Sequence, residues 1–334
     1  MLTIQDLECA ATCEDIFVNN ENQTKKIYRE FAKKYHPDVY KEQDMTVLFS
    51  KLNDLYEKAL EKISKGIWEE KDVLLLECAN GKKYKLKYLC ESDFELGKCY
   101  VSRNHLIYVI QESKKKFFDN ALKVIADLRF ADSEMEKEFK RYLPNIENHY
   151  QLKDGSYCLV ISKTDDIFPL SNLLEYYKNK GELLDPKHCA WVISRLNNLV
   201  CFLEFNDLVH NGLSIDNLFV SPKFHTICLY GGWWYSVPKG EKMIGTQKVI
   251  FDLMPVKEKA DKIATFKTDI ECVRAIGRSL NKNVPKPMLD WLEKGSSDNA
   301  FKEFESWNKV LTDSFGERKF VVLDISEKDI YHKI

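Results

Sequence analysis

Polar side chains that could take part in catalysis gather in one short segment, Val209-His210-Asn211-Gly212-Leu213-Ser214-Ile215-Asp216-Asn217-Leu218-Phe219-Val220. Its histidine, aspartate and asparagine are side chains that can accept a proton or bind a cation. A helical pattern from His188 to Phe205 leads into the segment. A short strand and a Gly-Gly turn, Leu229-Tyr230-Gly231-Gly232, follow it. The pattern therefore predicts a polar loop held between a helix and a strand.

A second candidate is the tripeptide His36-Pro37-Asp38, near the N-terminus. The preceding residues, Gln23 to Tyr35, have the periodicity of an amphipathic helix. Proline disfavours the helical conformation in the residue before it, so we expect the helix to end at the tripeptide. One face of this helix is basic, with Lys25, Lys26, Arg29 and Lys33, and the other is apolar, with Ile27, Tyr28, Phe31 and Tyr35.

The composition of the whole chain is that of a globular protein. It has 334 residues, of which 44% are hydrophobic and 31% charged, and a net charge of -2. This length suits two domains, and this charge argues against a general nucleic-acid binder. No apolar run approaches the roughly 20 residues that span a bilayer, and no signal peptide is visible. The ten cysteines lack zinc-site spacing, which favours reduced, buried thiols and a cytoplasmic location.

The first 66 residues predict a small helical domain. Residues 42–63 form a second amphipathic pattern, and two helices joined by a short connection make an antiparallel hairpin. The apolar stripe of the second helix contains Leu48, Leu52, Leu55 and Ala59, and the residues expected to complete the core are Ile4, Leu7, Ile16 and Phe17.

A basic helix, His-Pro-Asp and a second apolar helix together resemble the J domain of DnaJ-type co-chaperones. The resemblance covers most of residues 1–65 and departs from the family at Thr3-Ile4-Gln5-Asp6-Leu7, where an aromatic start is usual. It implies docking on a DnaK-type heat-shock chaperone and stimulation of its ATP hydrolysis. A lysine-rich face would steer the domain toward an acidic surface. The implied docking residues are Lys25, Lys26, Arg29, Lys33, Lys34, His36, Pro37 and Asp38.

The remaining residues predict an α+β domain. Strand patterns at residues 73–76 and 84–88 flank the turn signal Asn80-Gly81. Further strands are expected at 106–110, 120–125 and 157–162, with a charged helix at 133–142. A helical C-terminal half follows. This order resembles the two lobes of a protein kinase. The expected divisions are a J domain at 1–66, a linker at 67–72, a small lobe at 73–165 and a large lobe at 166–334.

Kinase nucleotide-binding motifs are matched only in part. Ala121-Leu122-Lys123 resembles the Val-Ala-Ile-Lys strand, which implies Lys123 as the phosphate-binding lysine, with Glu138, or alternatively Glu134, as its partner on a helix. The alternative is that Lys123 is a surface lysine. Gly97 alone stands for the glycine-rich loop, so a side chain such as Tyr100 or Arg103 could cover the cleft instead.

The polar loop lacks the groups that a kinase needs there. By the same resemblance, Gly212 replaces the catalytic base and Ser214 the catalytic-loop lysine, while Asn217 is retained. Tyr230 replaces the metal-binding aspartate, and a phenol cannot take the place of a carboxylate on magnesium. Asp269 is expected to cap the backbone of this loop. The sequence thus predicts a pseudokinase without bound metal or cofactor, with ATP binding doubtful.

Trp233-Trp234-Tyr235 follows the Gly-Gly turn, and either core packing or an exposed partner site would suit this apolar triplet. The two halves together resemble phage-encoded proteins that join a J domain to a kinase-like domain. The resemblance implies a co-chaperone in the host cytoplasm whose pseudokinase domain binds a protein client. It gives no role in nucleic-acid or membrane binding. The alternatives are an atypical nucleotide-dependent kinase or transferase, and a decoy that inhibits the chaperone.

Overall fold

The computed structural model describes residues 2–38, 40, 45–68, 71–317 and 321–331. The chain divides into two compact units. One contains the residues up to Leu74 together with Lys85–Lys87, and the other contains the rest. Each unit has its own cluster of buried apolar side chains. A separate apolar core in each unit is what two successive domains of one chain are expected to have.

The N-terminal unit is helical. It contains α1 (Ile4–Cys9), a 3-10 turn, α2 (Glu21–Tyr35) and α3 (Thr46–Lys65). The two predicted long helices are present, although residues 42–44 of the second lie outside the described part of the chain. The Asn20 side chain caps α2 by accepting a hydrogen bond from the Gln23 amide at 3.0 Å. Helix α2 packs on α3 over a core of Leu7, Ala10, Cys13, Ile16, Phe17, Phe31, Tyr35, Met45, Leu52, Leu55 and Ala59.

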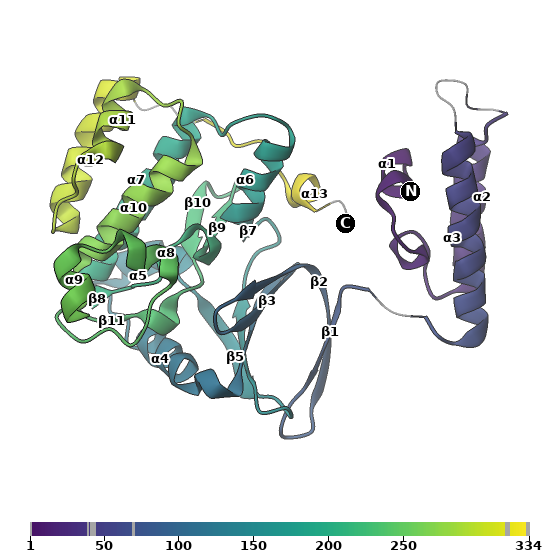
Figure 1. Ribbon diagram of the computed structural model, residues 1–334, viewed down its shortest axis with the longest axis horizontal. Coiled ribbons are helices and arrows are strands. Elements are labelled where there is room, and N and C mark those ends of the chain that lie inside the picture. The colour runs from purple at the N-terminus through teal and green to yellow at the C-terminus, as the bar shows by residue number, and fades with distance from the viewer. Residues whose placement is uncertain (1, 39, 41–44, 69–70, 318–320, 332–334) are drawn as a thin grey trace. The chain divides into compact units, whose positions relative to one another are not determined.

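An antiparallel sheet follows along the chain (Figure 1), and apart from Val73, Leu74 and Lys85–Lys87 its residues belong to the second unit. Its order is β1-β2-β3-β4-β6-β5. The turn signal predicted at Asn80-Gly81 lies between β1 and β2, where Gly81 has a φ of 83°. The strands are β1 (Val73–Glu77), β2 (Lys83–Phe94), β3 (Gly97–Ser102), β4 (His105–Ile110), β5 (Asn145–Gln151) and β6 (Tyr157–Ser162).

Two helices separate β4 from β5, and one of them corrects the sequence analysis. Residues 120–125, predicted to be a strand, lie in helix α4 (Lys115–Ala126). The buried side chains Phe117, Phe118 and Ala121 recur with helical spacing, whereas a strand would bury alternate residues. The predicted charged helix is present as α5 (Ser133–Phe139), followed by a 3-10 turn to Tyr142.

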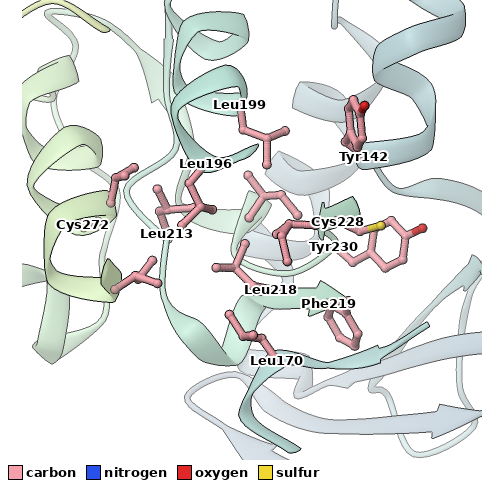
Figure 2. Packing of buried hydrophobic residues seen from close by; sticks show 14 of the residues in the cluster. Tyr142, Leu170, Leu196, Leu199, Leu213, Leu218, Phe219, Cys228, Tyr230 and Cys272 are labelled. Carbon is pink, nitrogen blue, oxygen red and sulfur yellow. The ribbon is translucent and has the colours of Figure 1, made fainter. Parts of the chain in front are cut away.

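The large lobe is built around α7 (Pro186–Phe205), which contacts both α10 (Phe266–Leu280) and α12 (Ala300–Phe315). Figure 2 shows Leu196 of α7 beside Leu213 of the following loop. The other elements are β7 (Phe168–Pro169), α6 (Leu170–Asn179), β8 (Leu208–Val209), β9 (Leu218–Ser221), β10 (Thr226–Leu229), β11 (Val237–Pro238), α8 (Lys248–Leu253), α9 (Val256–Asp261), α11 (Lys286–Glu293) and α13 (Glu327–Ile330).

The C-terminal end of the described chain ties the two lobes of this unit together. Tyr331 is buried, and its hydroxyl accepts hydrogen bonds from the Cys90 thiol of β2 at 3.6 Å and from the Asn172 amide of α6 at 3.3 Å. Strand β2 belongs to the small lobe and α6 to the large lobe. One side chain thus contacts both.

Candidate functional site

The His36-Pro37-Asp38 tripeptide forms a compact loop at the end of α2. His36 is the C-terminal cap, because its amide still donates to the Ala32 carbonyl at 3.1 Å. Its ring meets the Phe49 ring of α3 edge-on at 5.0 Å, and its Nδ1 accepts the Asp38 amide hydrogen at 3.2 Å. Pro37 is partly buried and Asp38 is exposed. The loop therefore presents its aspartate on a backbone that the histidine holds in place.

The basic face of α2 remains accessible. Lys26, Arg29, Lys33 and Lys34 are exposed, and Lys25 is partly buried. Lys25 pairs with Glu21, and Lys26 lies 3.9 Å from Glu30. Exposed pairs of this kind contribute little to stability, so they leave the lysines free to meet another surface.

In the large lobe, Asp269 holds the polar loop as predicted. Its carboxylate accepts the amide hydrogens of His210 at 2.6 Å and of Asn211 at 3.0 Å. Burial raises the pKa of Asp269 to about 7, while these two hydrogen bonds act in the opposite direction. Burial also lowers the pKa of His210 to about 3. The histidine is thus neutral, and its ring packs edge-on against Trp233 at 4.9 Å.

The backbone around Gly212 leaves no room for a side chain. A Cβ atom placed on Gly212 would lie 2.6 Å from the Gly232 carbonyl oxygen. One on Gly232, whose φ is 83°, would lie 2.6 Å from the Gly212 oxygen. Real Cβ atoms do not approach oxygen so closely, so this backbone contact requires glycine on both sides. Gly212 is therefore part of the packing of the loop.

The Asn217 side chain makes its hydrogen bonds to protein groups in and next to its own loop. Its amide nitrogen lies 2.7 Å from the Gly212 carbonyl oxygen, 3.2 Å from the Ser214 hydroxyl and 3.4 Å from the Gln247 side-chain oxygen. Its other end faces Gly231, where a Cβ would come within 2.3 Å of Oδ1. Both ends of the side chain are thus enclosed by protein atoms.

Tyr230 is turned into the core. Its ring packs on Phe219 at 5.5 Å, and Figure 2 shows it beside Cys228. Burial raises the pKa of its hydroxyl well above the ordinary value, so the phenol stays neutral. A neutral phenol supplies no charged oxygen to a magnesium ion. In the described part of the chain, no group of three or more His, Cys, Asp or Glu side chains could hold a metal.

Three aromatic side chains meet where the small lobe faces the polar loop. Phe94 lies at the end of β2, Tyr108 on β4 and Trp234 just after the Gly-Gly turn. The ring centroids of Phe94 and Tyr108 are 5.5 Å apart, and each lies 5.0 Å from Trp234. Tyr108 and Trp234 are buried. We call these three residues the aromatic plug.

The sequence analysis missed Phe94 and Tyr108. Core packing was one of the two interpretations of Trp233-Trp234-Tyr235, and it is confirmed, because all three side chains are buried. The exposed partner site, the other interpretation, is wrong. Tyr100 and Arg103, which could cover the cleft by the sequence analysis, both contact other side chains. Tyr100 packs edge-on against Tyr88 at 5.2 Å, and Arg103 lies 3.8 Å from Asp165.

The structure does not pair Lys123 with Glu138. Lys123 is exposed on α4, which contradicts its assignment to a strand but agrees with a surface position. Glu138 lies on α5, where it pairs with Arg141 and accepts the Tyr142 hydroxyl. Among the described residues no ion pair joins Lys123 to Glu138. Glu138 and Tyr230 instead line a pocket of about 1160 Å³.

The comparisons with solved structures identify the fold. A BubR1 kinase domain superposes with a TM-score of 0.53 at 12% identity, covering 78% of this chain and 93% of that chain. A rhoptry antigen kinase domain of Toxoplasma gondii gives a TM-score of 0.49 at 12% identity, covering 87% and 96%. No protein-family model and no curated protein matches the sequence.

The chain therefore contains a protein-kinase-like fold. At this identity the likeness extends to the fold alone. Within the residues that the structure describes, no helix is both long and apolar enough to cross a membrane.

Proposed function

We propose that this protein is a co-chaperone. Its N-terminal unit recruits a DnaK-type heat-shock chaperone and stimulates its ATPase, and its kinase-like unit binds a client or partner protein without catalysing phosphoryl transfer. The observation that carries the proposal is the placement of His36-Pro37-Asp38 at the end of a basic, exposed helix face.

The support for chaperone docking lies in the chemistry of that surface. Arg29, Lys33 and Lys34 project from the last turns of α2, next to the loop that carries Asp38. Exposed positive charges speed association with an acidic surface, and they do so most at low salt. A loop fixed by the His36 ring adds a defined shape for recognition.

The support for a non-catalytic role comes from the second unit. Phosphoryl transfer depends on positioning the reactants and on neutralising charge around the transferred group. Here the base position is a glycine packed against Gly232, Tyr230 is a buried phenol, and the Asn217 amide is used within the loop. The aromatic plug supplies a further obstacle, because Tyr108 and Trp234 meet between the small lobe and the polar loop.

The primary test is steady-state ATP hydrolysis by a bacterial DnaK-type chaperone with the full chain added. We expect stimulation by the unmodified protein and none by His36→Gln. The matched control is His149→Gln, the same change at an exposed position of β5, which should stimulate like the unmodified protein. Equal activity of the two variants would contradict docking through the tripeptide. Inhibition of chaperone-dependent refolding would instead indicate a decoy.

A second measurement tests the kinase-like unit. We expect no binding of ATP in equilibrium dialysis, with or without magnesium. We also expect no transfer of the γ-phosphoryl group to the chain or to an added protein. ATP binding followed by transfer would overturn the non-catalytic assignment and establish an atypical kinase.

A further inference from the structure

The last described segment of the chain, residues 321–331, is attached to the rest of the second unit through its side chains. It contains α13, which lies beside α6 (Figure 1). Its backbone hydrogen bonds stay within the segment, as from the Tyr331 amide to the Glu327 carbonyl oxygen at 2.8 Å. Among the described residues, no backbone hydrogen bond joins the segment to another element. The segment can therefore leave its place without breaking a helix or a strand elsewhere.

Tyr331 is the anchor of this segment. It is 6% exposed, and its hydroxyl accepts hydrogen bonds from the Cys90 thiol at 3.6 Å and the Asn172 amide at 3.3 Å. The Asn172 amide nitrogen also lies 3.6 Å from the Cys90 sulfur, so two polar groups surround one hydroxyl. Burial raises the pKa of this hydroxyl well above its ordinary value, so the phenol is neutral. The place selects tyrosine, because a phenylalanine ring would offer neither group a hydrogen bond.

A charged group lies one helical turn before this anchor. Glu327 and Tyr331 are four residues apart at the two ends of α13, and residues at this spacing share one face of a helix. The nearby cation is Lys163, which is only 8% exposed. Burial lowers the pKa of Lys163 to about 8, and Glu327, Asp166 and Asp165 act in the opposite direction. Glu327 thus adds a favourable charge to a cation that two carboxylates of the β6–β7 connection already compensate.

The segment fits its place imperfectly. The Oε1 atom of Glu327 is buried and has no hydrogen-bond partner among the described residues. Burial raises the pKa of Glu327, and Lys163 acts in the opposite direction. A buried acceptor without a donor costs free energy, so this contact is weaker than the site allows. A segment held in this way can be displaced by one that fits better.

We call Cys90, Asn172 and Lys163 the anchor site. We propose that the anchor site binds a partner protein through one helical turn with a glutamate four residues before a tyrosine. The chain's own end fills the site until the partner displaces it. This inference rests on the proposed function, in which the kinase-like unit binds a client or partner. The chemistry of the partner follows from the segment already seated there, whose phenol meets Cys90 and Asn172 and whose carboxylate acts on Lys163.

The test measures binding of a fluorescein-labelled peptide of residues 321–331 to the full chain by fluorescence anisotropy. The tethered segment competes at a high effective concentration, so we expect Tyr331→Ala to bind the peptide at least about tenfold more tightly than the unmodified protein. The same peptide with its own tyrosine replaced by alanine should lose this gain. Stimulation of the DnaK-type chaperone should be equal for the unmodified protein and Tyr331→Ala, because the docking residues lie in the N-terminal unit.

A second substitution in the Tyr331→Ala protein tests the site itself. Adding Asn172→Leu should weaken peptide binding at least about fivefold, because the phenol loses a hydrogen-bond donor. The matched control is Asn179→Leu, the same change at an exposed position of α6, which should leave binding unaltered. Thermal melting of each variant checks the fold. If Tyr331→Ala does not fold, Tyr331→Phe decides, because it keeps the ring and should still tighten peptide binding a few-fold.

Two results would overturn the proposal. One is equal binding of the peptide to the unmodified protein and to folded Tyr331→Ala, and the other is equal binding of the peptides with and without the tyrosine. A dimer of the unmodified protein that is lost in Tyr331→Ala would replace the partner with a second copy of the chain. Failure of the unmodified protein to stimulate the chaperone would instead remove the co-chaperone function and leave the peptide result standing.

Discussion

The loop after α2 and the loop around His210 both follow a long helix and both carry a histidine, an aspartate and neighbouring polar groups. Their surroundings are opposite. His36 is partly exposed and contacts residues within its own small unit, whereas His210 is fully buried. Asp38 faces solvent, while the backbone beside His210 is held by the buried Asp269.

This difference separates an exposed loop, whose side chains are accessible, from a buried loop, whose side chains hold the fold. An exposed loop on a rigid helix can lose a side chain with little effect on stability, so its composition is free to serve binding. A buried loop in glycine-to-glycine contact cannot change without disturbing its neighbours. The kinase-like loop thus resembles a catalytic loop in outline while its polar groups are used for packing and hydrogen bonding.

The largest expected effect is at Gly212. We expect Gly212→Asp, which places a carboxylate at the base position, to lower the free energy of unfolding by about 4 kcal/mol or more. The new side chain would clash with Gly232 and bury an unpaired charge. Urea denaturation measures the loss. Gly295→Asp is the control, because a Cβ there meets no atom within 4 Å. Normal stability in Gly212→Asp would contradict the packing argument.

A smaller loss of stability is expected when Asp269, whose carboxylate holds the same loop, is changed. Asp269→Asn should cost about 3 kcal/mol, since the new amide group would point a donor at an amide hydrogen that the carboxylate now accepts. Urea denaturation again gives the magnitude. The exposed Asp216→Asn should change stability by less than about 0.5 kcal/mol. Similar values for the two variants would show that Asp269 does not hold the loop.

Lowering the pH should reduce the stability of the protein, because protonation of His210 is unfavourable in the buried loop. Its folded pKa is about 3, below the ordinary value of 6.5, so the unfolded chain takes up a proton first as the pH falls. The stability contributed by neutral His210 is present above pH 6.5 and is lost toward pH 3. Asp269, with a raised pKa of about 7, has the opposite sign: its contribution is present below pH 3.8 and is lost as the pH rises through 7.

Comparison with His210→Phe isolates the histidine, because Asp269 is common to both proteins. Between pH 7 and pH 5 the unmodified protein should lose about 2 kcal/mol relative to the variant. Denaturation at a series of pH values measures this. Parallel pH profiles for the two proteins would contradict a buried, neutral His210.

The smallest stability effect is expected on the basic face. Lys33→Glu should change the free energy of unfolding by less than about 0.5 kcal/mol, yet slow association with the DnaK-type chaperone, most clearly at low salt. Stopped-flow binding at two ionic strengths measures the rate. Lys58→Glu makes the same charge change at an exposed position of α3 and should leave the rate unaltered. Equal slowing by both variants would mean that net charge alone acts.

The sequence predicted those features that depend on local patterns. The two long helices of the N-terminal unit, the strands at 106–110 and 157–162, and the Asp269 cap were all predicted, and all are present. The short apolar run at 120–125 was misassigned because such runs suit a helix or a strand equally. Only the spacing of Phe117, Phe118 and Ala121 distinguishes the two, and it lies mostly before that run.

The aromatic plug could not be predicted in the same way. Phe94 and Tyr108 are both far from Trp234 in sequence, and their meeting with it depends on the register of β2, β3 and β4. A shift by one residue would turn Tyr108 to the other face of the sheet. The pocket beside α5 had no sequence signal either, because its lining comes from separate elements along the chain.

The contact of Tyr331 with both Cys90 and Asn172 has a mechanical consequence. Enzymes that close around a substrate and then release it need lobes that can rotate about a hinge. Here the hydroxyl of a single side chain, Tyr331, links β2 to α6. These two hydrogen bonds oppose a rotation that would separate β2 from α6.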